Sequence, residues 1–142
     1  MKIQLHNGIT IQYYDNGKKK LKGFIIDHEW DGTLTEWYEN GKVKFKGNFK
    51  NFKKEGLFEE WYENGQIKSQ KVFLNGALNG KSIKWNDQGQ KLKEEHFSNG
   101  RHHGLFKTWY ENGQLCSQIT MKNDTVHEVI GKWEPDGLPT SN

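Results

Sequence analysis

The chain has 142 residues with a formal net charge of +3 and 27% charged residues, and this length fits a single domain. It contains one alanine against 16 glycines and 19 aromatic residues, a composition that opposes helix and predicts an all-β chain rich in turns. The longest fully apolar run is Phe24-Ile25-Ile26, which excludes a membrane-spanning helix, and the N-terminus lacks the apolar core of a signal peptide, so we expect a cytoplasmic protein.

A repeat of 24 residues runs through the chain. One series of repeated positions is aromatic: Tyr13, Trp37, Trp61, Trp85, Trp109 and Trp133. A second series is glycine: Gly17, Gly41, Gly65, Gly89, Gly113 and Gly137. A third series is Ile25, Phe49, Phe73, Phe97 and Met121. Such regularity is typical of repeat architectures. We therefore divide a single domain, 1–142, into an N-terminal cap at 1–7, units at 8–31, 32–55, 56–79, 80–103 and 104–127, and a partial unit at 128–142.

Each unit is predicted to form two antiparallel strands. In the unit at 56–79, the strands are expected at 57–62 and 66–74, with the tight turn Glu63-Asn64-Gly65 between them and a polar loop at 75–80. Short strands separated by frequent turn residues indicate an antiparallel meander. The predicted fold is therefore one elongated, twisted β-meander of tandem hairpins, with about 11 strands in total.

The last turn of the chain indicates the type of hairpin loop. Asn-Gly is compatible with a two-residue type I′ loop, or with a three-residue loop in which a left-handed glycine closes a type I turn. The last unit has Pro135-Asp136-Gly137 in place of Glu-Asn-Gly. Proline suits the first central position of a type I turn, but a two-residue loop would require its missing N–H for strand pairing. We therefore predict the three-residue loop, with Trp37 opposite Val43.

This register predicts which side chains share a face of the sheet. It also sets Glu36 opposite Lys44, and Glu60 opposite Lys68, as cross-strand ion pairs. One face is expected to carry the structural core: Trp37, Phe49, Trp61, Phe73, Trp85, Phe97, Trp109 and Trp133. The opposite face is expected to carry aromatic residues among charged ones: Tyr38, Phe58, Tyr62, Phe106 and Tyr110.

The aromatic residues of this second face are candidates for contact with a partner. Exposed aromatic side chains rimmed by charge are typical of protein-binding surfaces. The alternative is that tyrosine and phenylalanine occur there because they favour strands. Because the register places them opposite the expected core, we expect them to contribute more to binding than to folding.

Three segments of the chain resemble one known repeat family. They are Trp37-Tyr38-Glu39-Asn40-Gly41-Lys42, Trp61-Tyr62-Glu63-Asn64-Gly65-Gln66 and Trp109-Tyr110-Glu111-Asn112-Gly113-Gln114. They resemble MORN repeats, in the bacterial variant found in YwqK-family antitoxins. The loop Asn99-Gly100-Arg101-His102-His103-Gly104 is similar to the Asn-Gly-Lys-Arg-His-Gly stretch of ordinary MORN units. The unit at 80–103 departs from the pattern, with Asn86-Asp87-Gln88 in place of Tyr-Glu-Asn.

The sequence contains no pattern typical of an active site or a metal site. The histidines are His6, His28, His96, His102, His103 and His127. They do not recur with the repeat, whereas zinc needs three or four converging ligands, so we expect solvated loop histidines. Cys116 is the only cysteine, which excludes a disulfide framework, and no patterned base accompanies it. We therefore expect no catalytic residue, no metal, no cofactor and no enzymatic activity.

The partner hypotheses follow from the resemblance and from the charge. The resemblance implies a non-enzymatic, antitoxin-type module that neutralises a partner protein, a toxin, by covering its surface. The alternative is a MORN scaffold or an adaptor on an anionic membrane, against which the interspersed glutamates argue. The basic residues are 20 lysines and the single Arg101, which argues against nucleic acid, because its readers favour arginine. Self-association into a homo-oligomer stays open.

Overall fold

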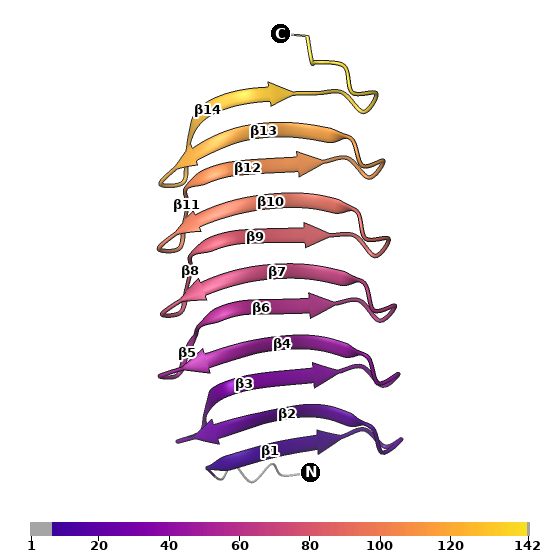
Figure 1. Ribbon diagram of the computed structural model, residues 1–142, viewed down its shortest axis with the longest axis vertical. Coiled ribbons are helices and arrows are strands. Elements are labelled where there is room, and N and C mark those ends of the chain that lie inside the picture. Colours follow the sequence, from indigo (N-terminus) through magenta and orange to yellow (C-terminus); the bar gives the residue numbers. More distant parts are fainter. Residues whose placement is uncertain (1–6, 142) are drawn as a thin grey trace.

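The computed structural model describes residues 7–141 and forms a single open antiparallel sheet, with no helix in that range (Figure 1). Eleven strands follow one another across the sheet: β1 (Gly8–Tyr13), β2 (Lys19–Ile26), β3 (Glu29–Trp37), β4 (Val43–Lys50), β6 (Gly56–Trp61), β7 (Ile67–Leu74), β9 (Gly80–Trp85), β10 (Lys91–Ser98), β12 (Gly104–Trp109), β13 (Leu115–Lys122) and β14 (Thr125–Lys132). Three two-residue strands lie at the return loops: β5 (Lys53–Lys54), β8 (Ala77–Leu78) and β11 (Arg101–His102). The predicted all-β meander is confirmed. Most of the predicted cap, 1–6, lies outside the described residues.

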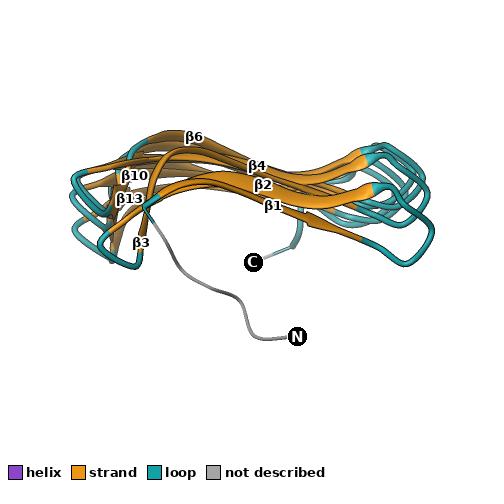
Figure 2. Ribbon diagram, turned by 90° about the horizontal axis from the view of Figure 1, so that it is seen from below, coloured by secondary structure: helices purple, strands orange, loops and turns teal. Residues whose placement is uncertain are grey.

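The sheet is a single layer. Every strand of the main series pairs with the strand that follows it in that series, so β1 and β14 form the two ends (Figure 1). Seen along its length, the sheet is arched rather than flat (Figure 2). Because each hairpin contacts only its neighbours, the protein is a one-dimensional stack, in which stability comes from the contacts within and between adjacent repeats.

The hairpin turns have the predicted three-residue loop. In the turn of the second unit, the Tyr38 N–H donates to the Lys42 carbonyl, and the Gly41 N–H donates back to the Tyr38 carbonyl, both at 2.9 Å. Gly41 has φ of 88°, a left-handed conformation that glycine adopts without steric cost. The equivalent glycines all have positive φ: Gly17, Gly41, Gly65, Gly89, Gly113 and Gly137.

A β-bulge accompanies each of the first five turns and changes the faces of the sheet. Trp37 stands opposite Val43 as predicted, but Glu36 stands opposite Phe45 and not Lys44. The next hairpin repeats this arrangement, with Glu60 opposite Ser69 and not Lys68. The extra residue of a bulge interrupts the alternation of side chains. Residues beyond the bulge therefore lie on the face opposite to the one that strict alternation predicts. The predicted Glu–Lys registers are therefore wrong.

The bulge separates the tryptophans from the phenylalanines. Residues directly opposite one another share a face, and this assigns two faces that we name here. The Phe face carries Phe45, Phe49, Phe58, Phe73, Phe97 and Phe106. The Trp face carries Trp37, Trp61, Trp85 and Trp109 with Leu57 and Leu105. The prediction that Phe49, Phe73 and Phe97 lie with the tryptophans on one core face is wrong for this reason.

The better packed side of the sheet is the Phe face. Among the described residues, only three apolar side chains are buried, namely Ile25, Leu34 and Phe58, and the pairing places all three on the Phe face. On the Trp face, Leu57 is 47% exposed. The last tryptophan of the series, Trp133, follows β14, and its ring lies over Gly131.

Candidate binding surface

The centre of the Phe face is an aromatic cluster around Phe58. The Phe58 ring lies 5.6 Å from Phe45, 5.5 Å from Phe49 and 4.9 Å from Phe73, measured between ring centroids. The Lys54 ammonium lies over the Phe58 and Phe73 rings. Phe58 is only 4% exposed, so it cannot insert into a partner. Its predicted role as an exposed anchor is wrong, because the bulge brings Phe49 and Phe73 to its own face.

The tyrosines of the turns connect successive repeats. Each tyrosine hydroxyl donates to the carbonyl of the tryptophan one repeat further on: Tyr14 to Trp37, Tyr38 to Trp61, Tyr62 to Trp85 and Tyr110 to Trp133, at 2.6–3.0 Å. Burial, followed by the Glu63 charge, raises the pKa of Tyr38. The Cys116 side chain beside Tyr110 raises the pKa of that phenol to about 12. These bonds give Tyr38, Tyr62 and Tyr110 a structural role that was not predicted.

This series of interrepeat bonds is interrupted after the fourth unit. Asn86 occupies the tyrosine position, and its amide bonds the Gln90 side chain of its own turn at 3.0 Å. Gln88 occupies the position of Asn64, whose amide donates to the Asp87 carbonyl of the next turn at 2.7 Å. Within residues 7–141, no side chain of the 86–89 turn bonds the following turn. The contact between the turns of the fourth and fifth units is therefore weaker than the others.

We predict that Asn86→Tyr raises the free energy of unfolding by about 1 kcal/mol, because its hydroxyl would donate to the Trp109 carbonyl as in the other repeats. Asn86→Phe is the matched control, since it adds the ring without the hydroxyl. Urea unfolding followed by tryptophan fluorescence measures both variants. Equal stability of the two variants would show that the hydroxyl bond contributes nothing.

A polar hollow interrupts the Phe face between its two groups of aromatic residues. Ser69 and Ser82 are 8% and 6% exposed and line this hollow. They occupy the repeat positions of Phe45 and Phe58, 24 residues earlier. The hollow has a volume of about 320 Å³ and is lined by Glu60, Lys68, Ser69, Lys71, Ser82, Ile83, Lys84, Lys93 and Glu95. Serine at these two positions therefore leaves a basic depression between the two groups of aromatic residues.

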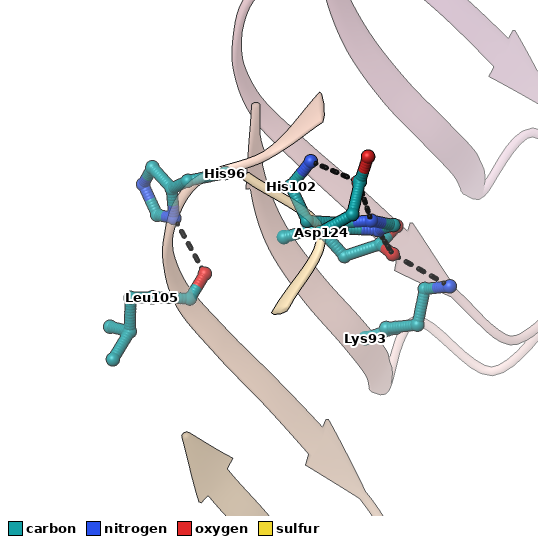
Figure 3. A network of polar contacts seen from close by, with 6 residues as sticks. Lys93, His96, His102, Leu105 and Asp124 are labelled. Atoms are coloured by element: carbon teal, nitrogen blue, oxygen red, sulfur yellow. Dashed lines mark hydrogen bonds and ion pairs between the residues drawn. The ribbon is translucent and has the colours of Figure 1, made fainter. Parts of the chain in front are cut away.

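Beside the hollow, His102 joins three elements (Figure 3). Its Nε2 lies 2.9 Å from Glu95 Oε1, and its Nδ1 lies 3.2 Å from Asp124 Oδ1. Glu95 also pairs with the Lys93 ammonium at 2.9 Å. The backbone N–H of His102 donates to Asp124 and lowers the pKa of that carboxyl. The imidazole stacks on Phe97 with ring centroids 4.4 Å apart. The expectation of a solvated loop histidine is wrong at this position.

The comparison with protein families identifies the repeat. Four segments match the family described as MORN repeat variant, at residues 7–27, 30–51, 54–75 and 103–123, more than half of the chain. The chain belongs to the MORN-repeat family. The matched segments of this MORN-repeat protein leave out 76–102, although β9 and β10 keep the register of the other hairpins. No curated protein matches the chain. The described residues include no helix of the length and apolar character needed to cross a membrane.

The structure of this MORN-repeat protein places Phe58 and Phe106, two of the five predicted partner-binding residues, on the Phe face. Tyr38 lines a hollow of about 170 Å³ together with Phe45 and Glu60 of the Phe face and Trp61 of the Trp face, and Lys44 lies over its ring. Tyr62 and Tyr110 follow the ends of β6 and β12 and close their turns as Tyr38 does. The prediction missed the serine hollow. An alignment of the units could have revealed it, because serine replaces phenylalanine at two positions of a single unit boundary.

Proposed function

We propose that this MORN-repeat protein is a non-enzymatic protein-binding module that contacts its partner with the Phe face. The observation that carries the proposal is a single-layer sheet with one face on which aromatic side chains surround a polar hollow. Within residues 7–141, no other element covers this face. Aromatic residues around a few polar groups are typical of the central part of protein interfaces, and repeat sheets offer extended surfaces for such contacts.

The chemistry of the titratable groups supports a non-enzymatic role. Both ring nitrogens of His102 contact carboxylate oxygens, at 2.9 Å and 3.2 Å, so neither nitrogen is free to contact a substrate. Burial raises the pKa of Glu94, but the Lys91 and Lys81 ammonium groups outweigh this, and the pKa stays below its usual value. A carboxyl that acts as a general acid needs the opposite shift.

The partner class is the narrower part of this proposal. The resemblance of the repeats to those of YwqK-family antitoxins supports a toxin as the partner, neutralised by coverage of its surface. A toxin partner makes a direct prediction about cells. The partner is first captured from native lysate with the tagged MORN-repeat protein as bait. Expression of this captured partner alone should arrest growth, and co-expression of the MORN-repeat protein should restore it. Continued growth with the partner alone would contradict the antitoxin role while leaving the binding role intact.

The binding role is tested with two neighbouring residues on opposite faces. Phe106→Ala removes an aromatic side chain from the Phe face, and Leu105→Ala is the matched control on the Trp face. We expect the Phe106 variant to bind the captured partner about 30-fold more weakly than wild type, the effect of losing a typical interface anchor. Leu105→Ala should leave the affinity nearly unchanged. Circular dichroism confirms that both variants fold. If Leu105→Ala weakens binding more than Phe106→Ala does, the interface lies on the Trp face instead.

Vesicle flotation separates this proposal from the membrane alternative. Protein that floats with anionic vesicles but captures no partner would favour a membrane adaptor. We expect no flotation at physiological salt, because glutamates are interspersed among the lysines of every unit, and surface charges are strongly screened under those conditions.

A further inference from the structure

The serine hollow of the Phe face has the features of a built site. Two positions that hold large rings in the preceding unit hold Ser69 and Ser82, and the vacated space stays open with a volume of about 320 Å³. Small-molecule sites generally begin at about 300 Å³, so this hollow is at the small end of that range. Its size fits one or two side chains of a partner.

The charge of the hollow is predominantly positive. Four lysines line it, namely Lys68, Lys71, Lys84 and Lys93, against the two carboxylates Glu60 and Glu95. The charge of Glu95 is already balanced, because the Lys93 ammonium lies 2.9 Å from its Oε1. Within residues 7–141, Lys71 and Lys84 have no carboxylate within 4.0 Å. Two ammonium groups of the hollow are therefore available to an anion.

The strand register sets like charges opposite one another in this hollow. Lys84 of β9 pairs directly with Lys93 of β10 and, on its other side, with Ser69 of β7. The equivalent position in the two preceding units is a glutamate, Glu36 and Glu60. Like charges directly opposite each other destabilise a sheet. An anion bound between Lys84 and Lys71 would offset the charge of Lys84 and so weaken its repulsion with Lys93.

We propose that the serine hollow recognises an acidic side chain, Asp or Glu, of the partner protein. This inference rests on the proposed function, because it assigns the occupant of the same face. Aromatic rings flank the hollow on both sides, the Phe58 cluster on one side and Phe97 with Phe106 on the other. The matching partner segment therefore carries an acidic residue between apolar residues. Charge complementarity of this kind mainly sets specificity and the rate of association.

The test uses the full chain and two labelled peptides, one of alternating glutamate and leucine and one with glutamine in place of glutamate. Fluorescence anisotropy measures their affinity for wild type, for the double variant Lys71→Gln/Lys84→Gln, and for the matched control Lys22→Gln/Lys46→Gln on the Trp face. We expect the double variant to bind the acidic peptide at least about 10-fold more weakly than wild type, the effect of losing one good charged contact. The control should bind like wild type, and the glutamine peptide should not bind.

A second readout does not depend on the peptides. Without ligand, Lys84→Gln should unfold at a higher urea concentration than wild type, because it removes the repulsion with Lys93. An unchanged or lower urea midpoint of Lys84→Gln would show that Lys84 and Lys93 do not destabilise the sheet, and would contradict this part of the inference.

The remaining outcomes separate this inference from the proposed function. Equal binding of both peptides, or equal losses in the double variant and its control, would overturn the acidic site. Lysine-dependent binding of anionic vesicles without binding of the acidic peptide would also overturn it, in favour of a lipid headgroup. If Phe106→Ala binds the captured partner more weakly but the double lysine variant binds it like wild type, the proposed function is supported and the acidic site is contradicted. If neither variant changes the affinity, both fall.

Discussion

Phe58→Ala should lower the free energy of unfolding by about 3–5 kcal/mol, the usual cost of truncating a buried phenylalanine. Phe58 is the centre of the only aromatic cluster in which one ring contacts three others among the described residues. A single-layer sheet has few neighbouring atoms that can move into the space left by the ring. The stability of the variant is measured by urea unfolding and compared with that of wild type.

The adjacent residue in β6 is the matched control for this prediction. Leu57 lies on the Trp face and is 47% exposed, so Leu57→Ala should cost about 1 kcal/mol or less. The large difference between two neighbouring positions tests the assignment of the faces directly. If both truncations cost the same, or if Leu57→Ala costs more, the Phe face is not the better packed side of the sheet.

Gly47→Ala should lower the free energy of unfolding by about 1–3 kcal/mol, the range of overpacking substitutions. In most strands this substitution is favourable, because alanine loses less backbone entropy on folding than glycine. At Gly47 an added Cβ would lie 2.4 Å from the Cε1 atom of Phe58, closer than such atoms approach. The ring would have to leave its position among the other phenylalanines. The sign of the effect is therefore opposite to that expected from strand propensity.

A double-mutant cycle shows whether the ring causes this loss. In the Phe58→Ala background, the methyl group of Gly47→Ala meets no ring, so the substitution should be neutral or stabilising. The coupling between the two positions should therefore be large, as expected for residues in direct contact. A destabilisation that persists without the Phe58 ring would point to the backbone of β4 instead.

The sequence by itself determined the repeat, the strand order and the turn. Three series of positions recur every 24 residues without an insertion, and hairpin repeats of this length pair with their neighbours because their connections are short. Pro135 was enough to choose the three-residue loop, because a missing N–H and a fixed φ are local properties of the chain. The departure from the repeat pattern at Asn86 was also readable from a single unit.

Only the tertiary structure decided which side chains share a face and therefore where the candidate site lies. Strand patterns predict faces by strict alternation, and one extra residue in a bulge, such as Lys44 between Val43 and Phe45, reverses that alternation for the rest of the strand. The sequence had to assume a bulge-free ladder after each turn, so it assigned Phe49 and Phe73 to the Trp face. Because of the bulge, Phe58 packs against Phe49 in the aromatic cluster. The same register brings Ser69, Lys84 and Lys93 together in one hollow. A bulge depends on the balance between strand twist and side-chain packing across neighbouring strands, and that balance exists only once the strands are paired.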